Sequence, residues 1–257
     1  MNKIIKLGGL LFYGLSFSLL AGGSTPFFDD DPSTKFAPEY TFEANSIDED
    51  VLKMCGEFGK QVSRKELKTL FETHPNLTKS LLSINQSLDL EKLIDIWYTK
   101  RGFTHIFCGE IKKKNGRYSL GGLHYAPRYQ QLFEMKKISM CQPGMTACTT
   151  KDNEVVEDQG IYSIPVSFKT PDGREFKAVN GYNIKMNADE ILYEATRGFF
   201  KLNGEIGCFL DIPETGGYPA HTSVIVSTNG KGITTFYSVG PIGRANNEQQ
   251  HENKDCK

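Results

Sequence analysis

The sequence predicts an α+β protein in which a helical N-terminal portion is followed by antiparallel sheets. Up to residue 101, helix-start signals are each followed by apolar residues at helical spacing. After Gly102 the apolar residues alternate, and Asn-Gly and Pro-Asp-Gly turns separate the alternating stretches. Helices and strands that are segregated along the chain in this way are typical of the α+β class.

The first 23 residues have the three parts of a secretory signal, namely a basic start, an apolar stretch over residues 10–20 and small residues up to Gly23. Glycine and serine interrupt the apolar stretch, which makes a permanent transmembrane helix the weaker interpretation. We therefore predict cleavage near Gly23 and a secreted or periplasmic protein with no stable membrane association afterwards. Residues 24–45, rich in proline, aspartate, serine and phenylalanine, are predicted to form an extended arm.

The region 46–101 is predicted to consist of four helices. Ser46 followed by Glu49, and Ser63 followed by Glu66, have the spacing of a capping box, in which two side chains satisfy free amide groups of the first turn. The third and fourth predicted helices cover residues 77–84, after Pro75, and 90–100, after Asp89.

Residues 102–245 are predicted to contain the sheets and one further helix. That helix is capped by Asn187, with Glu190 three residues later, and has an apolar face. Asn-Gly turns, the first at Asn115, indicate hairpins. The predicted strands are residues 103–111, 117–120, 160–168, 175–179, 208–212, 222–227 and 233–239. The polar residues 246–257 are predicted to form a frayed tail.

Charge and cysteine content bear on partners and compartment. The net charge of −1 gives no overall attraction for polyanions, so nucleic-acid binding would depend on local clusters of lysine and arginine. All six cysteines follow the predicted cleavage point and can form disulfides in an exported chain. Cys141 and Cys148 bracket a Pro-Gly turn and are the best candidate pair, although spacing leaves the connectivity open. A zinc cluster is less favoured, because no CxxC or HxxxH spacing occurs.

Two of the five histidines, His105 and His124, flank the first predicted hairpin, which can bring both rings to one site. Imidazole titrates near neutral pH, so one ring can accept a proton while the other donates one. With a lysine to stabilise a charged phosphorane, this set suffices to cleave RNA through its own 2′-hydroxyl group. Gly109, Gly121 and Gly122 leave room there for a ligand to approach the backbone.

Two segments of the chain carry a family resemblance. GFTHIFCGEI, residues 102–111, and GGLHY, residues 121–125, resemble the EndoU-type, uridylate-preferring endoribonucleases. His105 and His124 stand at the places of the two family histidines, and the resemblance covers residues of about 100–240.

The resemblance implies strongly curved antiparallel sheets that flank a cleft, and a single-stranded RNA cut at uridines to give a 2′,3′-cyclic phosphate. It also implies that Lys177, which precedes a capped helix, stabilises the phosphorane, and that Thr235 and Tyr237 seat the nucleotide. Some family members respond to manganese or calcium, so the resemblance allows a divalent cation at the site. It predicts no certain cofactor. An inhibitor or immunity protein is expected as a partner of a bacterial toxin.

Each candidate residue also has a structural interpretation. A lone histidine on a strand is usually structural, and an aromatic residue such as Tyr237 is favoured in strands for packing. Lys169 and Lys185 are plausible substitutes for Lys177. The run Lys112–Lys114 is most simply a solvated hairpin tip, with attraction of phosphate as a secondary role. His74 is predicted to end a helix, His221 to be a turn residue at a strand start and His251 to lie in the tail.

Two other functions stay open beside the nuclease. The first is an exported binding protein that has the same fold without turnover and binds RNA or a protein partner. The second is a secreted metalloprotein in which both histidines are metal ligands.

Overall fold

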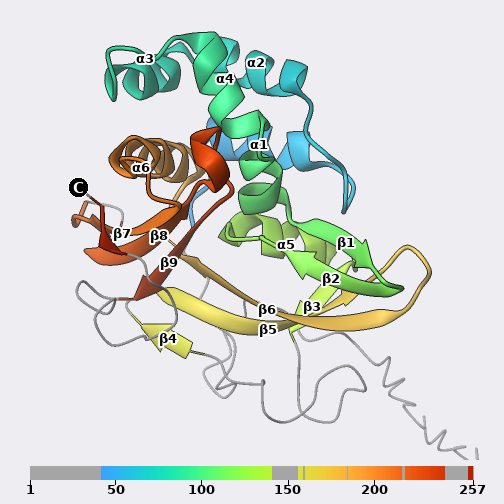
Figure 1. Cartoon of the computed structure of the whole chain (residues 1–257). Coiled ribbons are helices and arrows are strands. Elements are labelled where there is room, and N and C mark those ends of the chain that lie inside the picture. The colour runs from blue at the N-terminus through green and yellow to red at the C-terminus, as the bar shows by residue number, and fades with distance from the viewer. Residues whose placement is uncertain are drawn as a thin grey trace, which may run out of the picture.

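The computed structural model describes residues 42–140, 156–158, 160–183, 185–215, 218–240 and 254–256. Within these ranges the protein is α+β, with helices at the top of Figure 1 and small, mostly antiparallel sheets below them, which confirms the predicted class. The predicted signal and nearly all of the predicted arm lie outside the described residues, as do Cys141 and Cys148. None of the described helices has the length and apolar character needed to span a membrane.

Four helices form the N-terminal portion. They are α1 (Ser46–Cys55), α2 (Arg64–Thr73), α3 (Pro75–Ser83) and α4 (Leu90–Tyr98). The capping box of Ser63 and Glu66 at the start of α2 is confirmed. The box predicted for α1 is wrong by one residue, because Asn45 and Asp48 form it instead. The Asn45 side chain accepts hydrogen bonds from the amides of Ile47 and Asp48, so it satisfies two free donors of the first turn.

The stretch predicted as the first strand begins instead with the π-helix η1 (Thr104–Cys108). Phe103, Ile106 and Phe107 have the i, i+3, i+4 spacing of a helical face and are buried. The rings of Phe103 and Phe107 both pack against Trp97 of α4. The strand prediction is therefore wrong for this part of the chain, because the helix-spaced aromatic side chains have a core to pack into.

A short hairpin follows η1 and leads into a helix. Strands β1 (Glu110–Lys114) and β2 (Arg117–Gly121) pair antiparallel. Asn115 and Gly116 between them have φ angles of 50° and 76°, the left-handed conformation that a two-residue Asn-Gly turn requires. The next element, α5 (Ala126–Glu134), has a proline in its first turn and was missed by the sequence prediction.

Two larger sheets make up the rest of the protein. One contains β3 (Ile138–Met140), β4 (Val156–Asp158), β5 (Ile161–Lys169) and β6 (Glu175–Asn183). The other has the order β10-β7-β8-β9, with β7 (Gly207–Ile212), β8 (His221–Val226), β9 (Thr235–Gly240) and β10 (Lys254–Asp255); the 3-10 turn η3 (Thr228–Gly230) joins β8 to β9. Strand β6 is longer than predicted, and its far end meets β9, since a Cβ on Gly181 would lie 3.7 Å from the carbonyl oxygen of Ser238.

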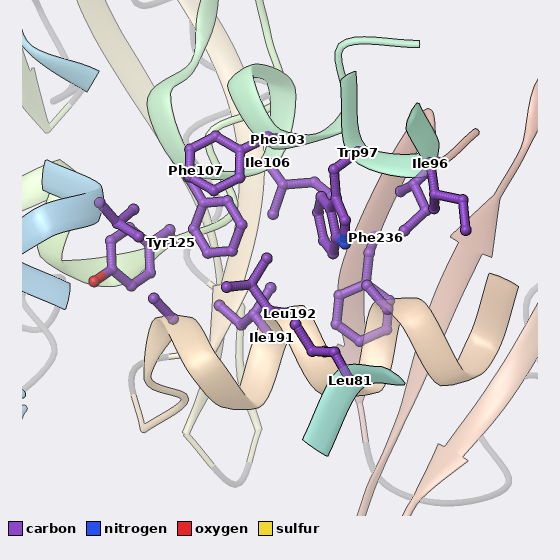
Figure 2. Close-up of a cluster of buried hydrophobic side chains, with 14 of the residues drawn as sticks. Leu81, Ile96, Trp97, Phe103, Ile106, Phe107, Tyr125, Ile191, Leu192 and Phe236 are labelled. Carbon is purple, nitrogen blue, oxygen red and sulfur yellow. The ribbon is translucent and has the colours of Figure 1, made fainter. Parts of the chain in front are cut away.

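The helices and the second sheet share one hydrophobic core, shown in Figure 2. Helix α6 (Ala188–Lys201) begins with the predicted capping box of Asn187 and Glu190 and lies along this core. Trp97 is fully buried at its centre and donates its indole N–H to Thr196 of α6 at 3.1 Å. The cluster also includes Leu81, Ile96, Phe103, Ile106, Phe107, Ile191, Leu192 and Phe236. Because η1 packs into this core, the position of its histidine is fixed by the whole fold.

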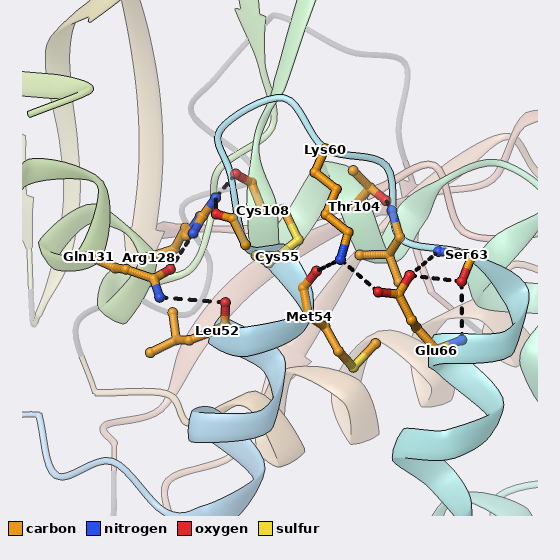
Figure 3. Close-up of a disulfide and its surroundings, with 12 residues drawn as sticks. Leu52, Met54, Cys55, Lys60, Ser63, Glu66, Thr104, Cys108, Arg128 and Gln131 are labelled. Atoms are coloured by element: carbon orange, nitrogen blue, oxygen red, sulfur yellow. Dashed lines mark hydrogen bonds and ion pairs between the residues drawn. A yellow bond between two sulfur atoms is a disulfide. The ribbon is translucent and has the colours of Figure 1, made fainter. Parts of the chain in front are cut away.

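A disulfide joins Cys55, at the end of α1, to Cys108, at the end of η1 (Figure 3). Arg128 of α5 is fully buried beside it and donates hydrogen bonds to the carbonyl oxygens of Gly56 and Cys108, the former at 2.8 Å. The disulfide and the guanidinium group therefore connect the same two chain segments.

A second disulfide joins Cys208 of β7 to Cys256 near the C-terminus. Residues 254 and 255 pair with β7 as the parallel strand β10. The prediction of a frayed tail is therefore wrong for residues 254–256, because a covalent bond and a strand pairing hold them.

Candidate active site

Two backbone hydrogen bonds hold the histidine-bearing segments side by side. The amide of Leu123 donates to the carbonyl oxygen of His105 at 2.8 Å, and the amide of His124 donates to that of Ile106 at 2.7 Å. The chain that leaves η1 to form the β1–β2 hairpin therefore returns next to its starting point. The centroids of the two histidine rings are 5.7 Å apart, so the structure places both rings at one site.

Gly122 makes this close approach possible. Its φ angle is 69°, and a Cβ on this residue would overlap with the carbonyl oxygen of His105. Any side chain here would push the two segments apart. A Cβ added to Gly109 or Gly121 would lie nearest to side-chain atoms of the protein. The expectation that these glycines leave room for a ligand is therefore wrong for Gly122, whose space is taken by the backbone of its neighbour.

The backbone of β6 fixes the tautomer of His124. Its Nδ1 lies 2.7 Å from the carbonyl oxygen of Gly181, and because a carbonyl only accepts hydrogen bonds, Nδ1 carries the proton. Burial of the ring, together with the neighbouring His105, lowers the pKa of His124 to about 3. At neutral pH the ring is therefore uncharged, and the lone pair lies on Nε2.

A carboxylate orients the ring of His105. Its Nδ1 lies 2.9 Å from Oε2 of Glu110, and Nζ of Lys112 lies 2.8 Å from the same oxygen. Burial opposes ionisation of Glu110, but the hydrogen bonds from His105 and Lys112 outweigh it and lower the pKa of the carboxyl group to about 2. An ionised carboxylate only accepts hydrogen bonds, so Nδ1 of His105 is the donor in this pair.

Tyr237 adds a third ring to the site. Its centroid lies 5.2 Å from that of His124, with 30° between the ring planes. As predicted from strand alternation, Thr235 and Tyr237 share one face of β9, while Phe236 points into the core. The hydroxyl oxygen of Thr235 is buried and has no hydrogen-bond partner among the described residues. A buried hydroxyl group without a partner is costly, so this one lacks the compensation that a hydrogen bond gives.

The third predicted catalytic residue, Lys177, lies farther along β6. Its backbone pairs with Ser167 of β5. It precedes Gly181 by four residues, which is about 13 Å along a strand. The role of Lys177 stays a prediction, as does that of its substitutes Lys169 and Lys185, which are exposed.

Two further histidines have structural partners away from this site. His74 ends α2, as predicted, and its Nε2 lies 2.9 Å from Asp50. His221, which was expected to be a turn residue at a strand start, is the first residue of β8, where it is fully buried and its Nδ1 lies 2.9 Å from the carbonyl oxygen of Pro219. His251 lies outside the described residues.

The described residues at the site do not fit a divalent cation. No group of three or more histidine, cysteine, aspartate or glutamate residues that could hold a metal ion occurs within the described ranges. Manganese and calcium favour several oxygen ligands. Glu110 contributes a carboxylate, but its Oε2 is already bound by His105 and Lys112. No chemical step is therefore assigned to a metal here.

The sequence prediction missed the two groups that orient the histidines. Glu110 belongs to the motif quoted above, and its position five residues after His105 was the available signal. Gly181 had no signal, because any residue can supply a carbonyl oxygen. Only the path of β6 past His124 selects it.

These pKa shifts predict a loss of stability in acid. His124 has a pKa of about 3 in the folded protein and 6.5 as its ordinary value, and Glu110 has about 2 against 4.5. As the pH falls, these two groups therefore take up protons in the unfolded chain before they do so in the folded protein. Their contribution to the free energy of unfolding is complete above pH 6.5 and decreases as the pH drops towards 3. For each proton, the decrease is at most about 1.4 kcal/mol per pH unit. Urea unfolding from pH 8 to pH 4 measures this slope. His124→Gln should flatten it between pH 6.5 and 4.5, and an equal slope in both proteins would contradict the assigned shift.

The comparisons with known proteins agree with this geometry. The family model described as bacterial EndoU nuclease matches residues 99–240, which is more than half of the chain and includes both histidines, Thr235 and Tyr237. No curated protein and no solved structure matches the chain. The family match supports an endoribonuclease, for which RNA is the substrate. The chain therefore belongs to the bacterial EndoU nuclease family.

Proposed function

We propose that the protein is an exported endoribonuclease that cleaves single-stranded RNA at uridines by transesterification through the 2′-hydroxyl group. The observation that carries this proposal is the pair of imidazole rings 5.7 Å apart, each with its Nδ1 held by the protein. This arrangement leaves both Nε2 atoms for a substrate. An uncharged ring beside a ring with a carboxylate partner provides one proton acceptor and one proton donor.

In the proposed reaction His124 is the general base and His105 the general acid. Nε2 of His124 takes the proton of the 2′-hydroxyl group, and the 2′-oxygen forms a bond to phosphorus. The bond between phosphorus and the 5′-oxygen breaks, and Nε2 of protonated His105 gives its proton to the leaving oxygen. The products are a 2′,3′-cyclic phosphate and a 5′-hydroxyl group, and exchange with water restores both rings. The low pKa of His124 supports this assignment, because it keeps the base unprotonated.

The nucleotide whose 2′-hydroxyl attacks would lie against β9. Tyr237 stacks beside His124 and offers a flat ring to a base, and the buried hydroxyl group of Thr235 can bond to the base edge. We propose that this pair seats the uridine. Lys177 is proposed as the cation that stabilises the phosphorane, which requires its ammonium group to reach the phosphate from β6.

Export is proposed from the N-terminal sequence and from the disulfides Cys55–Cys108 and Cys208–Cys256 of the described residues, which fit an oxidising compartment. RNA is an intracellular polymer, so an exported nuclease would act after entering another cell. We therefore also propose an inhibitor or immunity protein in the producing cell as a partner.

The products of a defined substrate test the reaction. A DNA oligonucleotide with one ribouridine contains a single 2′-hydroxyl group, so the parent protein should cut it once and leave a 2′,3′-cyclic phosphate on the uridine. Mass spectrometry identifies this end group, and ribocytidine and riboadenosine substrates measure the base preference. A 3′-phosphate formed without a cyclic intermediate would contradict the mechanism.

A nonenzymatic exported RNA- or protein-binding protein is the alternative. It would bind the same oligonucleotide without cutting it, which an electrophoretic mobility assay run beside the cleavage assay detects. Cleavage that disappears in a His105→Ala protein would reject this alternative.

Replacing Glu110 with glutamine should lower kcat/KM by roughly 10- to 100-fold, which is less than the roughly 100- to 10,000-fold that a general acid contributes, because His105 stays in place and loses only the carboxylate that orients it. The substitution removes the carboxylate that accepts the Nδ1 hydrogen bond of His105. The loss should appear in kcat with KM little changed, because Glu110 acts through His105 and not on the bound nucleotide. Glu72→Gln, an exposed glutamate on α2, is the matched control and should leave kcat and KM unchanged.

A further inference from the structure

The two faces of the β1–β2 hairpin differ in their surroundings. Residues of β1 alternate between the faces, so Glu110, Lys112 and Lys114 lie on one face, and the register adds Arg117, opposite Lys114, to it. The other face contains Ile111, Tyr118 and Leu120, which belong to a hydrophobic cluster separate from the core described above and packed around Leu123 and Tyr129. We call the first the cationic face; it begins at the His105–Glu110 pair and runs outward along the hairpin seen at the right of Figure 1.

The outer charges of the cationic face are uncompensated. Lys114 and Arg117 are both exposed, and within the described part of the chain neither forms an ion pair or a hydrogen bond through its side chain. By contrast, Lys112 pairs with Glu110 at 2.8 Å. Two adjacent unpaired cations on paired strands provide a place for an anion.

The cations on the opposite face are engaged with the protein. Nζ of Lys113 lies 4.7 Å from the centre of the Tyr118 ring and donates to its hydroxyl group at 3.1 Å. Arg174 lies 5.5 Å from the rings of Tyr118 and Phe176 and pairs with Asp172 at 2.7 Å. These contacts give the cations of the opposite face a structural role. Lys114 and Arg117 on the cationic face make no such contacts within the described ranges.

The position of the cationic face relative to the two histidines indicates which side of the cleaved bond it would contact. His124 and Tyr237 lie on the side of β6 and β9, whereas His105 is bonded to Glu110 at the base of the hairpin. In the proposed reaction His105 protonates the leaving 5′-oxygen, so the nucleotide that leaves lies on the hairpin side. The RNA continues from that nucleotide in the 3′ direction.

We propose that the cationic face of the β1–β2 hairpin binds backbone phosphates of the RNA on the 3′ side of the cleaved bond. From Glu110 to Lys114 the strand extends about 14 Å, which takes Lys114 and Arg117 beyond the nucleotides at the histidines. The hairpin is thus a binding surface for the downstream strand and has no part in proton transfer. This inference rests on the proposed function, because the direction follows from the role of His105.

Three substrates with a single ribouridine test the proposal. One is a dinucleotide, one has a long deoxynucleotide flank on the 3′ side only, and one has the same flank on the 5′ side only. The test variant is Lys114→Ala/Arg117→Ala. The matched control is Lys113→Ala/Arg174→Ala, which also removes two positive charges, from the opposite face of the same region. Kinetics and thermal unfolding are measured for all three proteins.

The test variant should raise KM for the substrate with the 3′ flank roughly tenfold and lower its logarithmic salt dependence by about 1.4, the effect of two lost phosphate contacts on a single strand. Its kcat, and its KM for the dinucleotide and the 5′-flanked substrate, should stay the same. The control variant should behave like the parent. An equal loss on both flanks, an equal loss in the control variant, or no loss at all would overturn the proposal.

A binding measurement separates this proposal from the catalytic one. Fluorescence anisotropy with 2′-deoxyuridine versions of the flanked oligonucleotides reports affinity without turnover. If the parent cuts none of the ribouridine substrates, the proposed reaction fails. The phosphate-binding surface is then still supported if the parent binds the 3′-flanked oligonucleotide more tightly and the test variant loses that preference, and it fails if no preference exists.

Discussion

Replacing His124 with alanine is expected to lower the rate of RNA cleavage by about 100- to 10,000-fold, the usual contribution of a positioned general base. The ring is held by Gly181 and stacks beside Tyr237, and no other described side chain replaces its Nε2 next to His105. A single-turnover assay with the ribouridine oligonucleotide measures the chemical step directly. His105→Ala should cause a loss of similar size.

The double substitution should raise the activation free energy of cleavage by less than the sum of the increases caused by the two single substitutions. A proton acceptor and a proton donor that act in one step depend on each other, so the double variant should be little slower than either single variant. His74→Ala is the matched control. This histidine lies between α2 and α3 and bonds to Asp50 of α1, away from the site. An unchanged rate in His124→Ala, or an equal loss in His74→Ala, would contradict the assignment of the base.

The second large effect is expected from the disulfide between Cys55 and Cys108. Replacing both with alanine should lower the free energy of unfolding by about 4 kcal/mol, because the bond closes a loop with a sequence separation of 53 residues and restricts the unfolded chain. The same change should lower kcat, since Cys108 ends the π-helix that contains His105. Urea unfolding and cleavage kinetics at a temperature where the variant is folded measure the two effects.

The other disulfide is the matched control. Cys208 and Cys256 are 48 residues apart, so their replacement should lower the free energy of unfolding by a similar amount, also about 4 kcal/mol. That bond joins β7 to the C-terminal strand β10 and does not touch either histidine segment. Its loss should leave kcat unchanged in the folded protein. Equal effects of the two replacements on kcat would show that the first disulfide has no special connection to His105.

Local signals in the sequence predicted much of the fold. The capping boxes at Ser63 and Asn187 are present, because a side-chain cap needs residues that are three positions apart and no partner from elsewhere. The Asn115-Gly116 turn has the positive φ angles that its residue types favour. The alternation of Thr235, Phe236 and Tyr237 gave the correct faces of β9 for the same reason.

Local sequence patterns gave wrong predictions where a contact between residues distant in sequence decided the structure. Residues 104–108 are a short apolar run that fits a strand or a helix, and packing against Trp97 selects the helix. The polar C-terminus suggested a frayed tail, but Cys256 bonds to Cys208 across 48 residues. Neither partner is visible in a local window of sequence.

The sequence by itself determined which residue types are available for proton transfer, and the short hairpin between His105 and His124 ensured that the two rings return to the same place. The tertiary structure decided what each ring does. His124 is uncharged because its ring is largely withdrawn from water and lies beside His105, while the carbonyl of Gly181 on β6 fixes the proton on Nδ1. Nδ1 of His105 faces an ionised Glu110 instead. The sequence shows only that a histidine is present, whereas the hydrogen-bond partner of its ring and its contact with water depend on neighbours in space.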